Sequence, residues 1–205
     1  MRCVNCGAFS LRTICAACAA NLAECRLGMR QVEGFSVFYY YGYSEIRELI
    51  LSKHHEYGAA VLARIASLSL AKFPLHLQRE ISANPQNYEA FKTDGIFKFN
   101  VVPLDDDARS GYSHTAILAR ALKSELVEPK FHCLRAQNRV KYTGQSLEFR
   151  LKHKRNFKIL TPPKFPVILV DDIITSGLSI LQARESLIDG GFMPVCGLVL
   201  ANAKE

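Results

Sequence analysis

The sequence predicts an α/β fold, in which helices flank a mainly parallel sheet and a small cysteine-rich segment precedes it. Two observations support this prediction. Apolar runs long enough for buried strands alternate along the chain with amphipathic helical segments. The 205 residues, of which 49% are hydrophobic, suffice for one domain with a substantial core and a small appendage. This composition excludes a disordered or fibrous chain.

The predicted strands and helices follow one another from residue 31 onward. An aromatic strand over residues 35–43 precedes a helix that starts at Ser44, whose hydroxyl can cap it, and a second helix covers residues 57–73. The prolines and asparagines of residues 74–95 predict a surface connection with some helix. The remaining elements are a strand at 96–104, a helix at 113–127, strands at 131–134 and 167–170, a helix at 178–188 and a final strand at 193–200.

The N-terminal segment, residues 1–30, contains two cysteine pairs, each in C-x-x-C spacing. Cys3 and Cys6 form the first pair, and Cys15 and Cys18 form the second. Four soft thiolates in this arrangement suit a tetrahedral zinc ion, and four protein ligands leave no open position for water. The pattern therefore predicts a structural zinc knuckle. An iron–sulfur cluster, a redox-active pair and chance are the alternative interpretations.

The residues that follow the apolar strand at 167–170 predict a binding site. Asp171 and Asp172 come at the end of the strand, and a Thr-Ser-Gly turn leads into a helix. Backbone amides at the start of a helix, helped by the turn's hydroxyls, favour an anion. The two carboxylates can accept hydrogen bonds from vicinal ribose hydroxyls. The segment therefore predicts a ribose 5-phosphate site, although an ordinary strand end and helix cap would give the same residue types.

The stretch from residue 167 to residue 179 resembles the 5-phosphoribosyl 1-pyrophosphate (PRPP) motif of type I phosphoribosyltransferases. The resemblance implies that Asp171 and Asp172 hold the ribose hydroxyls. It implies that a magnesium ion bridges the pyrophosphate and the ribose hydroxyls, mostly through oxygens of the ligand and of water. The residues implied to hold the 5-phosphate are Thr175, Ser176, Gly177, Leu178 and Ser179.

Nearly the whole chain is similar to the ComF family of competence proteins, of the ComFC type. The features that carry this resemblance, in chain order, are the four cysteines, Val-Pro-Leu at 102–104, Arg-Ser-Gly-Tyr-Ser at 109–113, Gln-Ser-Leu at 145–147 and the PRPP-like stretch. The resemblance implies a type I phosphoribosyltransferase-like domain over residues 31–205. It also implies a role in natural transformation, in which single-stranded DNA is handled at the cytoplasmic side of the inner membrane, and contact with a competence DNA helicase.

Two stretches depart from the family pattern. Three acids, Asp105 to Asp107, stand where the family tends to carry basic residues, and Ser-Gly-Tyr-Ser at 110–113 replaces Arg-Gly-Phe-Asn. Adjacent carboxylates oppose the binding of a pyrophosphate leaving group unless they bind magnesium or point to solvent, which bears on catalysis more than on PRPP binding. The alternative function is a PRPP-dependent phosphoribosyltransferase that acts on a base or an amine. No catalytic residue can be assigned to it, because Tyr112 and His114 are candidates by position alone.

The net charge of +7 comes from one stretch of the chain. Residues 130–158 contain nine Lys or Arg and one acid, a net charge of +8, whereas the other residues contain 17 basic and 18 acidic ones, a net charge of −1. Aromatic side chains interleave these cations, which is typical of single-stranded nucleic-acid binding. A basic hood over the PRPP site and a plain solvated surface are the alternatives. The cations that we expect to contact DNA are Arg139, Lys141, Arg150, Lys152, Lys154 and Arg155.

The sequence also bears on location. No apolar run reaches the roughly 18 to 20 residues that cross a bilayer. The N-terminus lacks the apolar stretch of a secretory signal. We therefore expect a cytoplasmic protein without a transmembrane segment, which the family resemblance would place peripherally at the inner membrane.

Overall fold

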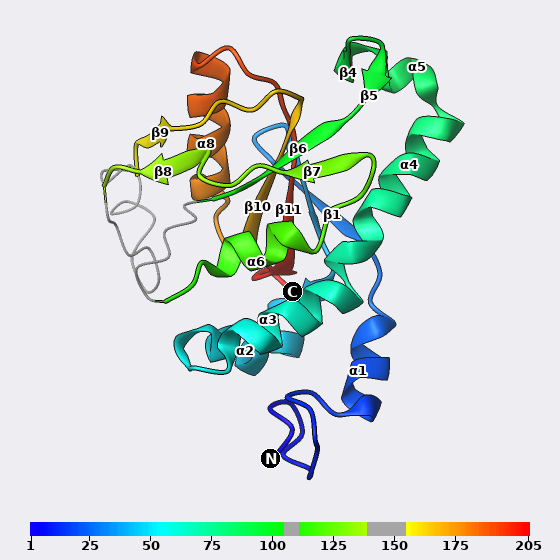
Figure 1. Cartoon of the computed structure of the whole chain (residues 1–205), viewed down its shortest axis with the longest axis vertical. Coiled ribbons are helices and arrows are strands. Elements are labelled where there is room, and N and C mark those ends of the chain that lie inside the picture. Colours follow the sequence, from blue (N-terminus) through cyan, green and yellow to red (C-terminus); the bar gives the residue numbers. More distant parts are fainter. Residues whose placement is uncertain (105–110, 139–154) are drawn as a thin grey trace.

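The computed structural model describes residues 1–104, 111–138 and 155–205. A seven-stranded sheet lies at its centre, in the order β1-β2-β11-β10-β6-β7 with β3 beside β11 (Figure 1). Within the described residues every pairing of this sheet is parallel except that of β1 with β2, which confirms the mainly parallel α/β prediction. The strands are β1 (Gly28–Val32), β2 (Phe35–Tyr39), β3 (Tyr41–Gly42), β6 (Phe99–Pro103), β7 (Val127–Pro129), β10 (Val167–Ile174) and β11 (Pro194–Asn202).

Helices flank the sheet, and Figure 1 shows α2, α3 and α6 grouped together with α8 apart from them. The α-helices are α1 (Ala16–Ala23), α2 (Tyr43–Leu51), α3 (Gly58–Leu68), α4 (Phe73–Ala83), α5 (Pro85–Tyr88), α6 (His114–Arg120) and α8 (Leu178–Asp189). Single turns of 3-10 helix are η1 (Ser52–His54), η2 (Leu70–Lys72) and η3 (Glu89–Phe91). Two small antiparallel sheets pair β4 (Lys92–Thr93) with β5 (Ile96–Phe97), and β8 (Leu134–Ala136) with β9 (Phe157–Ile159).

Alternate residues of β10 face opposite sides of the sheet. Ile168 and Val170 belong to the core that contains the buried side chains of α1 to α4 and α6. Val167 and Leu169 belong to a second core, which contains the buried side chains of α8 and of the β8–β9 pair. Because both faces of the strand are covered, the sequence shows a continuous apolar run rather than an alternating one.

The N-terminal cysteine-rich segment packs on the first of these cores. Ile14 and Leu22 are buried in it, together with Leu62 of α3. The hydroxyl of Tyr41 donates a hydrogen bond to the carbonyl of Leu22 at 2.8 Å. Strand β1 begins at Gly28, so the chain enters the main sheet within the last residues of this segment.

Two predicted helix bounds are wrong for identifiable reasons. Helix α2 begins at Tyr43 rather than Ser44, and the Glu45 carboxylate accepts a hydrogen bond from the Gly42 N–H at 2.9 Å, so Ser44 is not the cap. The helix expected over residues 57–73 ends at Leu68. Residues 73–83 form a separate helix, α4, which is the helical part expected in the connection at 74–95, because Leu77 and Ile81 lie four residues apart and are buried against the core.

The predicted strand at 131–134 is also wrong. The strand that joins the main sheet is β7 at 127–129, and β8 pairs with β9 outside it. The predicted helix at 113–127 ends at Arg120, because a turn follows in which Ser124 and Val127 exchange hydrogen bonds: the Ser124 N–H donates to the Val127 carbonyl, and the Val127 N–H donates to the Ser124 hydroxyl.

One stretch of the described residues, Gly58–Ala83, is long and apolar enough to cross a membrane. It comprises α3, η2 and α4, and half of its apolar window is buried inside the chain. This is weak evidence for a membrane span, because a core helix of a folded domain has the same length and composition.

Candidate phosphoribosyl-binding site

The site lies where the chain direction across the sheet reverses. From β6 the chain passes through α6 to β7 on one side, whereas from β10 it passes through α8 to β11 on the other. Strands β6 and β10 are direct parallel neighbours. Ligands of parallel sheets bind at the carboxyl ends of the strands at such a reversal. The predicted carboxylates, Asp171 and Asp172, lie at this end of β10.

Asp172 is the more buried of the two carboxylates, with 7% of its surface exposed. Its Oδ1 accepts a hydrogen bond from the Ile173 N–H at 2.9 Å. Its Oδ2 pairs with Lys53 Nζ at 2.5 Å and lies 3.9 Å from His114 Nε2. Although burial works to raise the pKa of Asp172, the charges of Lys53 and His114 outweigh it and hold the pKa below its usual value. Asp172 is therefore a carboxylate at neutral pH.

Asp171 has a higher pKa than Asp172. Burial and the negative charge of Asp172 raise its pKa to about 7, although the positive charges of Arg155 and Lys53 work to lower it. One of its oxygens, Oδ1, accepts a hydrogen bond from the Asp172 N–H at 2.9 Å. The pair therefore carries one firm negative charge and a second that titrates near neutral pH. A group that donates hydrogen bonds to both residues, such as a vicinal diol, stabilises the doubly charged form.

The turn after β10 brings the predicted phosphate-binding residues together. Thr175 is exposed, Ser176 is partly exposed, and the Ser176 hydroxyl accepts a hydrogen bond from the Leu178 N–H at 3.4 Å. Leu178 and Ser179 begin α8 with partly exposed side chains. The start of α8, a helix of 12 residues, lies next to these two hydroxyls. Such a helix start is a suitable environment for a phosphate.

Gly177 shapes this turn. Its φ is +83°, and a Cβ built on it would lie 2.6 Å from Cγ1 of Val32 in β1. Arg30, also in β1, donates from Nη1 to the Thr175 carbonyl at 2.8 Å and to Asn202 Oδ1 at 3.2 Å. The turn is thus fixed against the β1 and β11 side of the sheet, a reason for glycine that the sequence alone does not reveal.

Lys53 is a site residue that sequence reasoning missed. It lies in η1, and its carbonyl accepts a hydrogen bond from the Tyr112 hydroxyl at 2.7 Å. A Cβ on Gly58 would lie 2.2 Å from the Ser52 carbonyl oxygen and 2.4 Å from the Tyr112 hydroxyl, so this turn requires glycine. Burial works against the charge of Lys53, but Asp172 and Asp171 raise its pKa. No local sequence pattern marks Lys53.

His114, Asp171 and Asp172 each offer one ligand atom within 4.8 Å of the others, a spacing that a cation could bridge. Lys53 already holds Oδ2 of Asp172. A magnesium ion prefers oxygen ligands and keeps several waters. These three residues could therefore hold a cation, and a magnesium ion there would need water or other oxygen groups as its remaining ligands.

Of the six cations predicted to contact DNA, only Arg155 lies within the described residues; Arg139, Lys141, Arg150, Lys152 and Lys154 lie outside them. The Arg155 N–H donates to Gln182 Oε1 of α8 at 2.9 Å, and its charge acts on Asp171. The structure therefore places Arg155 against α8 and close enough for its charge to act on Asp171.

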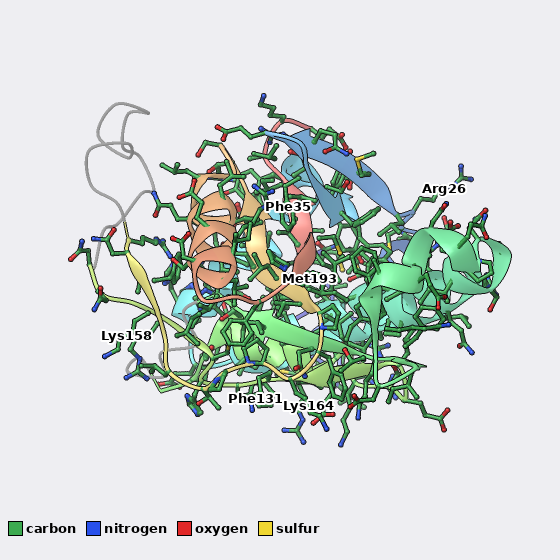
Figure 2. The ribbon with its side chains drawn as sticks, turned by 90° about the horizontal axis from the view of Figure 1, so that it is seen from above. Arg26, Phe35, Phe131, Lys158, Lys164 and Met193 are labelled. Atoms are coloured by element: carbon green, nitrogen blue, oxygen red, sulfur yellow. The ribbon has the colours of Figure 1, made fainter. Side chains whose placement is uncertain are left out.

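Other cations of the basic stretch lie on the β8–β9 pair. Arg135 and Lys158 are directly opposite each other across its two strands. Figure 2 shows Lys158 along one rim of the molecule with Phe131 and Lys164. Like charges directly opposite each other destabilise an antiparallel pair unless an anion offsets them. This pair is thus a candidate anion contact.

The four predicted cysteine ligands come together at the N-terminus. Their sulfurs all lie within 4.8 Å of one another, and Cys6 Sγ is 3.7 Å from Cys15 Sγ. Thiolates bound to zinc at about 2.3 Å lie about 3.8 Å apart in a tetrahedron. The backbone N–H of Cys15 donates to Cys3 Sγ at 3.2 Å, and Gly7 has the positive φ that the turn requires, +74°. The cluster can hold a metal ion.

The thiols of this cluster differ in their affinity for protons. Burial works against the thiolate of Cys3, but backbone N–H groups, that of Cys15 first, lower its pKa to about 6. The Asn5 side chain works to lower the pKa of Cys18, yet burial and the neighbouring thiols raise it to about 12. A bound cation would lower the pKa of all four thiols, Cys18 included, because it stabilises the four thiolates at once.

Comparison of the chain with protein-family models and with curated proteins finds no match to either.

Proposed function

We propose that the protein binds PRPP or a related phosphoribosyl ligand, with magnesium, as a ComF-type competence protein. The observation that carries this proposal is the arrangement at the end of β10, where Asp171 and Asp172 adjoin the turn that begins α8. The two carboxylates would accept the ribose hydroxyls, and the hydroxyls and amides of residues 175–179 would hold the 5-phosphate. Their position at the reversal between β6 and β10 supports the same conclusion.

Ligand-induced thermal stabilisation tests this proposal. A ligand at 100 times its dissociation constant adds about 2.7 kcal/mol to the free energy of unfolding. We expect PRPP with magnesium to raise the melting temperature, and Asp171→Asn combined with Asp172→Asn to abolish the rise. Asp189→Asn, at the exposed far end of α8, is the matched control and should keep it. A wild-type melting temperature that PRPP leaves unchanged would remove the proposal.

The same site could serve a phosphoribosyltransferase, in which the ligand is also cleaved. Release of pyrophosphate from PRPP in the presence of a nucleobase or an amine, lost in the double Asn variant, would identify the protein as such an enzyme. Binding without release would leave PRPP as a ligand that is not consumed.

We propose that single-stranded DNA binds to the basic stretch at residues 130–158, in keeping with a role in natural transformation. The supporting observation is the opposition of Arg135 and Lys158 across β8 and β9, within a stretch of charge +8. Each phosphate contact to a single strand contributes about 0.7 to the slope of log affinity against log salt. Replacing both cations with Ala should therefore reduce the slope by about 1.4.

The matched control for the DNA experiment replaces Arg79 and Lys92 with Ala, because these cations lie on α4 and β4, away from β8 and β9. The control should keep the salt dependence of the wild type. Equal slopes for the wild type and the Arg135 and Lys158 variant would exclude this pair from DNA binding.

We propose that the cysteine cluster holds a structural zinc ion. Its four sulfurs all lie within 4.8 Å of one another, and four thiolate ligands would leave no position for water on the ion. Because Cys3 and Cys18 are buried in the core shared with α3, loss of the metal should loosen that contact.

A further inference from the structure

Lys53 pairs with a carboxylate assigned to the ribose hydroxyls, although it lies outside the PRPP-like stretch. We propose that Lys53 forms a second anion subsite, which recognises a phosphate or pyrophosphate group on C1 of a ribose 5-phosphate bound at Asp171 and Asp172. The inference rests on the proposed function, and it assigns the recognition of the C1 substituent to a residue from η1.

The position of Lys53 along the sheet edge supports the proposal. The turn assigned to the 5-phosphate is fixed against β1 and β11, through Arg30 and Val32. Lys53 lies on the other side of β10, because its carbonyl accepts a hydrogen bond from Tyr112, which lies two residues before α6 in the connection from β6. In ribose 5-phosphate, C1 and C5 lie on opposite sides of the vicinal hydroxyls. A ribose that spans the two aspartates from the turn therefore directs its C1 substituent towards Lys53.

The hydrogen bonds of Asp172 explain how Lys53 becomes available to a ligand. Asp172 Oδ1 already accepts the Ile173 N–H, and Oδ2 pairs with Lys53 Nζ. A ribose hydroxyl that donates to Oδ2 competes with Lys53 for the same oxygen. A ligand that carries an anion on C1 offers the ammonium group a new partner, whereas ribose 5-phosphate offers none. Lys53 should therefore favour the first ligand and oppose the second.

The surroundings of Lys53 fix its backbone but leave room for its side chain to change partner. Its carbonyl is held by the Tyr112 hydroxyl, and the neighbouring turn is closely packed at Gly58. The side chain keeps 20% of its surface exposed, which distinguishes it from a fully enclosed ion pair. Lysine has a flexible stem and three donors, so it can exchange one oxygen for another by rotation of side-chain bonds.

Calorimetric titration of the full chain with PRPP and with ribose 5-phosphate, both with magnesium, tests the proposal. Lys53→Met keeps most of the stem and removes the charge. We expect it to weaken PRPP binding about 10- to 100-fold, as for loss of a charge-assisted hydrogen bond, and to leave ribose 5-phosphate binding unchanged or tighter. Lys53→Arg, which keeps the charge, should restore most of the preference for PRPP. Lys92→Met, which removes a lysine from an ion pair with Glu89, is the control and should change neither affinity.

The outcomes separate this inference from the proposed function. A wild-type protein that binds neither ligand contradicts the proposed function itself. A wild type that binds both ligands, with a Lys53→Met variant that loses or keeps both equally, overturns the role of Lys53 alone. If Lys53→Met fails to fold, a titration of the wild type supplies the test: inorganic pyrophosphate should bind to the complex with ribose 5-phosphate and magnesium, and failure to bind overturns the inference.

Discussion

Replacement of Gly177 by Ala tests the link between the turn and the edge of the sheet. The new Cβ meets Cγ1 of Val32 at 2.6 Å and Cγ2 at 3.1 Å, both closer than carbon atoms approach without displacement. The residue must also keep its φ of +83°. The substitution thus adds two separate costs, one of backbone conformation and one of packing, at the start of α8.

The size of each cost can be worked from the structure. The left-handed conformation costs a residue with a Cβ about 1–2 kcal/mol, and forcing an extra carbon into packed space costs about 1–3 kcal/mol. We therefore expect Gly177→Ala to lower the free energy of unfolding by about 2–5 kcal/mol. Gly95→Ala is a control for the first cost, because Gly95 has a φ of +77° and no atom within 4 Å of its would-be Cβ.

Chemical denaturation of four proteins measures the packing cost. They are the wild type, Gly177→Ala, Val32→Ala and the double variant. Because Val32→Ala removes both methyl groups that the new Cβ meets, the double variant should recover about 1–3 kcal/mol relative to the sum of the single changes. Effects that add to within about 0.5 kcal/mol would refute the clash with Val32.

Three further predictions concern the metal, the carboxylate pair and the Lys53 turn. Cys6→Ser should abolish zinc binding and lower the melting temperature, because three thiolates hold the ion less tightly; metal analysis that still finds one zinc per chain would contradict this. Since folding raises the pKa of Asp171 from 3.8 to about 7, its contribution to stability should fall as pH rises from about 4 to 7; Asp171→Asn should flatten this part of a melting-temperature profile, and an unaltered profile would exclude Asp171 as its source. Tyr112→Phe should cost about 0.5–1.5 kcal/mol in urea denaturation, because it removes the hydrogen bond to the Lys53 carbonyl.

The sequence predicts the Asp171 segment well because that part of the site is contiguous. A strand, two carboxylates, a turn and a helix start follow one another, so local rules suffice to place them. Lys53 lies 119 residues before Asp172, and only the packing of η1 beside the end of β10 brings the two together. No local pattern can predict such a contact from one sequence.

The edges of the sheet are where the strand predictions fail. Strand β1 has a single buried residue, Val32, and two polar side chains, so it lacks the apolar run that marks β10. Strand β7 has three residues and ends in proline, which suits an edge strand because no neighbour needs its N–H. Edge strands bury less apolar surface than central ones, so hydrophobic patterns indicate them weakly.

Arg155 belongs to the basic stretch and also acts on the carboxylate pair. Two roles of Arg155 can be separated by experiment: contact with DNA and an effect on the pKa of Asp171. The sequence predicts a DNA contact, whereas in the structure the charge of Arg155 lowers the pKa of Asp171. Arg155→Gln should therefore raise the pKa of Asp171 above about 7 and move the upper end of its pH-dependent loss of stability to higher pH. Melting temperatures from pH 5 to 9 measure this shift, with Lys158→Gln as the control for general loss of positive charge. If Arg155→Gln weakens DNA binding and leaves the pH profile unchanged, Arg155 acts on DNA and not on Asp171.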